Sequence, residues 1–189
     1  MDSNVKLVAA VLALLALLGV AACGNDDRAQ PAFDVPPWAK VAPEQIAEAE
    51  KHGVPVAFEN DLGMRFALIP AGTFLMGSPE DERDGVGREF SDQEPQDVRV
   101  ARPFYIQVTE ATNSQYRRAI PTHDSRVSGY GPRLDGASQP VVCVTWKHAT
   151  AFAEWVTNQG SRVYRLPSET EWERACRAGT ATPFSFGPT

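Results

Sequence analysis

The order of apolar and polar residues divides the chain into a leader, a connecting segment and a globular part. Residues 7–20 form an unbroken apolar run, which is too short for a comfortable membrane span and is typical of an export signal. Residues 24–55 include a polar run at residues 25–28 and carry several prolines, which predicts a tether that contains one short helix over residues 43–52. We therefore expect the domain to begin near Val56 and to occupy residues 56–189.

Several short strands are predicted inside the domain. Residues 64–69 and 73–76 read as two strands joined by a Pro-Ala-Gly turn. Residues 98–108 alternate between apolar and polar positions on either side of an Arg-Pro interruption, which predicts a further strand region. Residues 140–146 are largely apolar and predict a buried strand.

The most clearly marked helix lies near the end of the chain. Ser168 and Glu171 are three residues apart and form a capping box, in which each side chain can accept from the backbone N–H of the other. Trp172, Ala175 and Cys176 then follow at helical spacing as a short apolar stripe. We expect this stripe to dock on the core, with Trp172 buried.

Two other helices have similar start signals. Thr112 and Gln115 form a second capping box, and Thr145 is a suitable N-cap for a helix over residues 147–158. The residues expected to face inward are Tyr116, Ala119 and Ile120 in the first helix and Ala149, Phe152, Ala153 and Val156 in the second. Residues 121–139, between these helices, are rich in glycine and predict a loop. The full pattern predicts a mixed α/β (α+β) fold with short strands, short helices and much irregular loop.

Charge and composition narrow the function. The chain has 18 Lys and Arg residues against 24 Asp and Glu residues, a formal net charge of −6, so it offers no basic patch and we expect no nucleic-acid partner. The three cysteines and three histidines lack the spacing of a zinc site. We expect His123 and His148 to be surface side chains rather than ligands. We therefore assign no catalytic, cofactor-binding or metal-ligating residue.

Acidic residues gather in a loop over residues 79–97. Such a loop could bind calcium, because this ion takes several oxygen ligands. The spacing does not match an EF-hand loop, however. We favour a solvated surface loop.

The apolar leader ends in Val20-Ala21-Ala22-Cys23. This tetrad resembles a bacterial lipobox, in which Cys23 becomes the lipid-modified N-terminus; the alternative is an ordinary signal peptide that contains a cysteine. We favour a lipoprotein signal over residues 1–23, because position, flanks and tetrad agree. Gly24 stands where inner-membrane retention usually shows Asp. We therefore expect an exported protein held in the bacterial cell envelope by the lipid at Cys23, on the outer membrane and facing the periplasm.

Two cysteines remain if Cys23 is acylated. In an exported protein, Cys143 and Cys176 can form a disulfide. The alternatives are two buried free thiols, or pairing with partners outside this chain. Neither cysteine has an adjacent His or Lys that would lower its pKa, so we do not expect either to be a catalytic nucleophile.

Four segments together resemble the sulfatase-modifying factor family, the formylglycine-generating enzymes and their relatives. They are residues 69–78 (IPAGTFLMGS), which resemble the opening hairpin of the family, and residues 108–116 (VTEATNSQY), 140–146 (PVVCVTW) and 164–179 (YRLPSETEWERACRAG). The resemblance covers about residues 56–187. It implies the sulfatase-modifying factor fold, which is related to C-type lectin-like domains.

The resemblance also implies an activity for complete family members. These oxidise a substrate cysteine to formylglycine in sulfatase maturation, using a C-terminal cysteine pair that binds copper(I); calcium is a further ion that a complete member could hold. The matching C-terminal motifs do not occur in this sequence. We therefore expect residues 56–189 to be a truncated, N-terminal portion of the enzyme domain, without a cofactor and inactive by themselves. The alternative is a non-catalytic, lectin-like binding or scaffolding lipoprotein. An exported protein or peptide is the expected substrate or partner.

Overall fold

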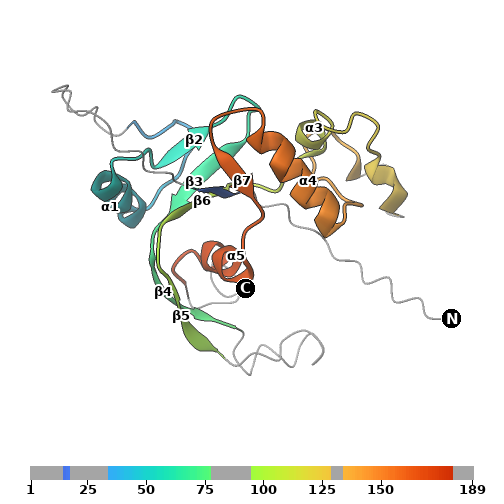
Figure 1. Ribbon diagram of the computed structural model, residues 1–189. Helices are drawn as coiled ribbons and strands as arrows, with labels where there is room; N and C mark the ends of the chain where they lie inside the picture. Colours follow the sequence, from blue (N-terminus) through green and yellow to red (C-terminus); the bar gives the residue numbers. More distant parts are fainter. Residues whose placement is uncertain (1–14, 18–33, 78–94, 129–133, 181–189) are drawn as a thin grey trace. The chain divides into compact units, whose positions relative to one another are not determined.

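The computed structural model of the chain describes residues 15–17, 34–77, 95–128 and 134–180 (Figure 1). The chain divides into two compact units. Unit 1 comprises Met1–Cys23, Phe58–Phe66 and Gln107–Leu166, and unit 2 comprises Gly24–Ala57, Ala67–Ile106 and Pro167–Thr189.

The elements are short and of mixed type. The strands are β1 (Leu15–Leu17), β2 (Ala57–Glu59), β3 (Arg65–Ile69), β4 (Gly72–Met76), β5 (Gln96–Val100), β6 (Phe104–Gln107) and β7 (Val163–Arg165). The helices are α1 (Pro43–His52), α3 (Asn113–Tyr116), the 3₁₀ helix η1 (Ser125–Ser128), α4 (Trp146–Thr157) and α5 (Glu169–Arg177). Hydrogen bonds order one sheet as β2-β3-β6-β1-β7 and join β4 with β5 in a second. The predicted mixed α/β class is confirmed.

Strands β4 and β5 form an antiparallel ribbon in unit 2, with Gly72 opposite Val100 and Met76 opposite Gln96. The expected hairpin of β3 with β4 is wrong, because β3 pairs with β2 and β6 instead. The turn between β3 and β4 thus leads the chain from one sheet into the other. Gly72 makes this possible, because its φ of +150° lies in a region that side chains other than glycine rarely adopt.

Helix α1 packs as part of unit 2. Ala49 has no exposed surface, and Gln45 Nε2 donates to the Leu68 carbonyl at 2.7 Å. Gly53 ends the helix with a φ of +62°, which provides the left-handed stop that helices commonly use. The helix predicted within the connecting segment is confirmed. Among the described residues of this unit, the buried apolar ones are Ala49, Val56, Ala57, Leu68, Met76, Val100, Phe104, Tyr105 and Ile106.

Helix α4 supplies much of the core of unit 1. Its predicted inward face is confirmed, since Ala149, Phe152, Ala153 and Val156 are all buried. The ring of Phe152 lies 5.0 Å from that of Tyr116, and the ring of Phe66 lies 5.3 Å from that of Tyr164. Near α3 the prediction holds for Tyr116 but not for Ile120, which is 37% exposed. Ile120 lies beyond the end of α3 and is therefore not placed by that helix.

The capping signals formed as predicted. Glu171 N donates to Ser168 Oγ at 3.2 Å and Ser168 N donates to Glu171 Oε2 at 2.8 Å. The Thr112–Gln115 box has the same reciprocal bonds. His148 N donates to the N-cap hydroxyl of Thr145 at 3.2 Å.

Residues 140–146 are not a strand, so that prediction is wrong. Pro140 makes an isolated bridge with Thr112. Cys143 has a φ of +60°, which places it in the left-handed region and interrupts an extended chain. Val141 and Val144 are nevertheless buried, so the segment packs on the core as an irregular connection.

Two expectations fall mainly outside the described residues. Residues 78–94 of the acidic loop and Cys23 with its lipobox are not described. Of the leader, the structure describes β1, which pairs antiparallel with β7. Within the described parts of the chain, no helix combines the length and apolar character that crossing a bilayer requires.

Candidate functional site: a groove beside helix α5

A groove of about 600 Å³ lies in unit 2, beside α5, the start of α1 and the turn between β3 and β4. Apolar residues of its lining include Ile69, Pro70, Ala71, Phe74, Leu75 and Ala175. Its charged lining residues are Glu44, Arg174 and Arg177. Small-molecule sites commonly have volumes of about 300–1,000 Å³ and an apolar lining with a few polar groups, so this groove has the size and composition of such a site.

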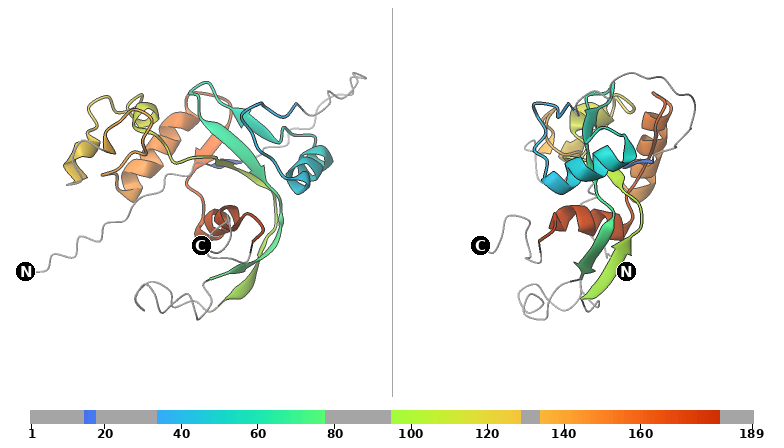
Figure 2. Two further views of the ribbon diagram at one scale, coloured as in Figure 1. Left: turned by 180° about the vertical axis from the view of Figure 1, so that it is seen from behind. Right: turned by 90° about the vertical axis from the view of Figure 1, so that its left-hand side faces the viewer.

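Helix α5 lies alongside the β4–β5 ribbon (Figure 2), and its polar face carries the hydrogen bonds to the ribbon. The residues of this face are Thr170, Glu173, Arg174 and Arg177, which follow the i, i+3, i+4, i+7 spacing of one helix side. Thr170 Oγ1 lies 3.8 Å from Met76 Sδ, and Glu173 Oε1 accepts from Gly77 N at 2.7 Å. The helix is therefore held on the ribbon by hydrogen bonds to backbone and side-chain atoms.

The apolar stripe of α5 consequently does not form a buried contact. Trp172 is 38% exposed, Cys176 is exposed, and α5 has no buried residue. The prediction that Trp172 is buried is wrong. The reason is that the turn and the ribbon form hydrogen bonds with the polar face of the helix, which lies opposite Trp172.

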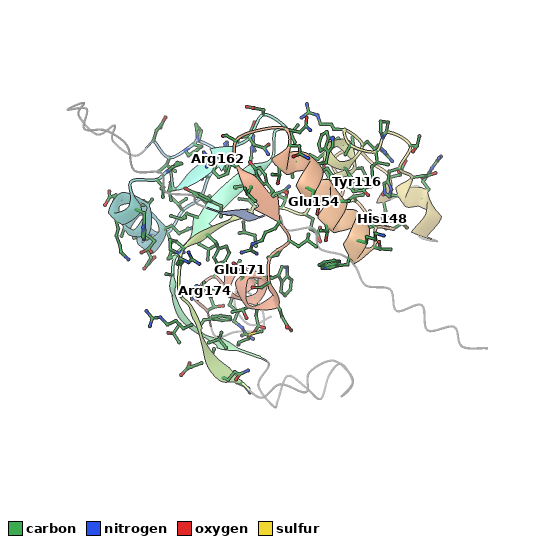
Figure 3. The ribbon with its side chains drawn as sticks, in the orientation of Figure 1. Tyr116, His148, Glu154, Arg162, Glu171 and Arg174 are labelled. Carbon is green, nitrogen blue, oxygen red and sulfur yellow. The ribbon has the colours of Figure 1, made fainter. Side chains whose placement is uncertain are left out.

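Arg174 ties α5 to the turn between β3 and β4 (Figure 3). Its Nε donates to the Pro70 carbonyl at 2.9 Å, its Nη2 to the Ala71 carbonyl at 3.2 Å and its Nη1 to the Thr73 carbonyl at 3.5 Å. Partial burial lowers the pKa of Arg174, because a buried cation loses hydration. Among the described residues, no carboxylate forms an ion pair with this guanidinium.

Arg177, by contrast, has a carboxylate partner. Its Nε donates to Glu173 Oε1 at 2.9 Å, and the two side chains are only 12% and 19% exposed. Arg177 also donates to the carbonyl of Gly77. The N–H of Gly77 in turn donates to Glu173. The Glu173–Arg177 pair therefore holds both the N–H and the carbonyl of Gly77. The opposite charges of the two side chains neutralise each other.

A buried polar cluster in unit 1 is centred on Asn113, which has no exposed surface. Its Nδ2 donates to the carbonyls of Leu134 and Gly136 at 2.8 and 3.0 Å. Its Oδ1 accepts from Ser125 Oγ at 2.5 Å. These bonds hold the irregular segment after α3 against the helix start.

His123 extends this cluster. Its Nε2 lies 3.2 Å from Ser125 Oγ and 3.0 Å from the Val142 carbonyl, and its ring meets Tyr116 edge-on at 4.8 Å. The expectation that His123 is a plain surface side chain is therefore wrong, whereas His148 is exposed. Although Ser125 and His123 are within reach of each other, Ser125 is fully buried and its hydroxyl serves Asn113. The hydrogen bonds of Ser125 and His123 therefore stabilise the local structure, and the two residues do not act as a nucleophile with its general base.

The thiols Cys143 and Cys176 are both free and exposed, so the alternative of two buried thiols is wrong. Partial burial and the charge of Glu173 raise the pKa of the Cys176 thiol, which disfavours the thiolate that a soft metal needs. At a given pH, more of the Cys176 thiol is therefore protonated than in an unperturbed cysteine.

Within the described ranges, no group of three or more His, Cys, Asp or Glu residues is placed to hold a metal ion. Helix-capping and stripe patterns did not single out Arg174. The polar i, i+3, i+4, i+7 row of α5 is the signal that could have identified it.

The family model described as "Sulfatase-modifying factor enzyme 1-like domain" matches residues 51–187. The chain belongs to this family. The solved structure of PvdO from Pseudomonas aeruginosa is 31% identical with a TM-score of 0.55, covering 68% of this chain and 53% of that one. The structure is thus a small mixed α/β domain with a sulfatase-modifying factor fold similar to PvdO.

The proteins to which the chain is similar include both a kinase and a formylglycine-generating enzyme. "Serine/threonine-protein kinase pkn1" of Chlamydia pneumoniae is 32% identical over 133 residues, which are 60% of this chain and 19% of the relative. "Formylglycine-generating enzyme" of Streptomyces coelicolor is 28% identical over 157 residues, 60% of this chain and 47% of the relative. The chain therefore spans about a fifth of the kinase and about half of the enzyme.

Proposed function

We propose that this chain is a binding and scaffolding member of the sulfatase-modifying factor family, and that its own residues do not convert cysteine to formylglycine. The state of the thiols supports the second half. Copper(I) is held by thiolates, and the raised pKa of the Cys176 thiol keeps more of this thiol protonated at a given pH. The groove beside α5 supports a binding role, since it combines an apolar lining with Arg174.

The proposal is tested by an oxidation assay on the purified full chain. The chain is incubated with copper(I), oxygen and a Cys-x-Pro-x-Arg peptide, and the peptide is then weighed by mass spectrometry. We expect no mass change, while the formylglycine-generating enzyme of Streptomyces coelicolor serves as the positive control. A formylglycine product that disappears on copper chelation, and also in Cys176→Ser, would contradict the proposal.

A second candidate is formylglycine formation by a longer product of the same gene. The observation in its favour is the set of relatives named formylglycine-generating enzyme, of which the Streptomyces protein is matched over 47% of its length. The test is to sequence the coding DNA beyond codon 189 and to assay the product of any continuing frame. Formylglycine formation by that product would establish this candidate.

We also propose that the chain is lipid-anchored at Cys23 and acts in the cell envelope, on the outer membrane facing the periplasm, where an exported protein or peptide would be its partner. The support is the Val20-Ala21-Ala22-Cys23 tetrad after the apolar run. Acylation of the cysteine would supply several hydrocarbon chains, which hold a protein at a membrane much more firmly than one.

A further inference from the structure

The groove beside α5 has the features of a site for one negative charge on an apolar body. We propose that it binds a small amphipathic carboxylate, with the carboxylate on Arg174 and the apolar body against Ile69, Phe74 and Ala175. This inference names a ligand class for the binding role proposed above and rests on it.

Arg174 still has hydrogen-bonding capacity for such a ligand. A guanidinium carries five N–H donors, and three of them are directed at carbonyl oxygens of the turn, which leaves two. The same bonds fix the guanidinium in place, so little further ordering is needed when a ligand binds. Carboxylates match the planar donor arrangement of arginine.

The charges around the groove favour a single anion. Arg177 is neutralised by Glu173 at 2.9 Å, whereas Arg174 has no carboxylate partner among the described residues. Glu44 also lines the groove but is exposed on the first turn of α1, where water screens its charge more than that of the partly buried Arg174. One effective positive charge fits a carboxylate better than a phosphate dianion.

The rest of the groove is suited to hydrocarbon. Ile69, Phe74, Leu75 and Ala175 line it, and a volume of about 600 Å³ accommodates a small molecule. Burial of methylene groups against such residues contributes to binding in proportion to the area removed from water. The ligand therefore needs both its charge and its apolar body.

The test compares three probes on the full chain, with Cys23→Ser to prevent acylation. Octanoate carries both features, octan-1-ol has the same chain without the charge, and acetate has the charge without the chain. We expect octanoate to bind about tenfold more tightly than either of the others in calorimetry. In NMR, the methyl signals of Ile69 and Ala175 should shift on octanoate addition while those of Val156, in the core of unit 1, should not.

Charge variants at the groove sharpen the test without touching Arg174. Leu75 is 39% exposed, so a charged side chain can be placed there. Leu75→Glu should weaken octanoate binding about threefold at low salt, because the added carboxylate repels the ligand. The uncharged control Leu75→Gln should still bind octanoate more tightly than octan-1-ol. Glu44→Gln should strengthen octanoate binding and leave octan-1-ol unchanged.

Several results would overturn the inference. Equal binding of octanoate and octan-1-ol would show a merely apolar groove, and shifts confined to Val156 would place the site elsewhere. Binding that appears only after deletion of residues 181–189 would show that the chain itself takes the groove. None of these outcomes alters the peptide oxidation assay, so failure here is distinguishable from failure of the non-oxidising role.

Discussion

Arg174 and Gly72 are matched in the structure. A Cβ built on Gly72 would lie 2.8 Å from Nη2 of Arg174, which is too close for two atoms that are not bonded. The absence of a side chain at Gly72 therefore lets the guanidinium reach across the turn to the carbonyls of Pro70 and Ala71. A backbone feature of β4 and a side chain of α5 thus depend on each other.

The first prediction follows from this match. Gly72→Ala should lower the free energy of unfolding by about 1–3 kcal/mol, since alanine is strained at this φ and also collides with the guanidinium. Urea unfolding of the full chain measures the change. Two glycines serve as controls. Gly53→Ala introduces the cost of a positive φ (+62°) without a collision, because no atom lies within 4 Å of the added Cβ. Gly160→Ala also meets no atom within 4 Å and gives the effect of a methyl group in open space. Equal losses for Gly72→Ala and Gly53→Ala would show that contact with Arg174 adds nothing.

A second prediction concerns the turn carbonyls themselves. Arg174→Gln removes the charge-assisted bonds to Pro70 and Ala71 and should cost roughly 2 kcal/mol of stability. Hydrogen–deuterium exchange should show the loss of protection in α5 and β4. The control is Arg118→Gln, because Arg118 is an exposed arginine. Unchanged exchange in α5 would mean that the helix is held on the ribbon by other contacts.

A third prediction tests the cluster around Asn113. Asn113→Ala should destabilise the chain by roughly 2–4 kcal/mol, because it leaves the carbonyls of Leu134 and Gly136 and the hydroxyl of Ser125 without their partner. Ser125→Ala should have a smaller effect, since it leaves two groups without this partner, Asn113 Oδ1 and the Val142 N–H, rather than three. The double variant should lose less than the sum of the single ones, because the two share a hydrogen bond. Strict additivity in urea unfolding would show that this bond contributes nothing.

The reactivity of Cys176 provides a fourth prediction. Burial and Glu173 raise the pKa of this thiol in the folded chain, so a smaller fraction is thiolate at any given pH than in the unfolded chain. The iodoacetamide reaction of Cys176 should therefore reach its half-maximal rate at a higher pH in buffer than in urea. Cys23→Ser and Cys143→Ser isolate the signal. A profile in buffer that coincides with the one in urea, or lies at lower pH, would argue against the raised pKa.

The fifth prediction addresses the proposed anchor. A diderm bacterium that expresses the chain should incorporate labelled palmitate into it, and Cys23→Ser should abolish the label, because the thiol of Cys23 is the expected attachment point. Cys143→Ser serves as the matched control and should keep the label. Equal labelling of wild type and Cys23→Ser would exclude the lipobox interpretation.

Helix starts were determined by the sequence alone. The boxes at Ser168 and Glu171 and at Thr112 and Gln115 formed with the predicted partners, because a capping bond joins residues three positions apart and needs no other element. The inward face of α4 was equally local, since its apolar residues repeat at helical spacing around Phe152. The family segments of the sequence likewise predicted the fold that the comparison with PvdO supports.

Tertiary structure decided which surfaces meet. Trp172 remains 38% exposed because α5 turns its polar face to the ribbon, and this choice depends on carbonyl groups of a turn about 100 residues earlier in the chain. The φ of Cys143 and the separate pairing of β3 and β4 were likewise not predicted from the sequence. The periodicity of a sequence describes one helix or strand at a time. Burial and strand pairing depend also on the hydrogen-bonding groups of the neighbouring element, which can be far away in the sequence.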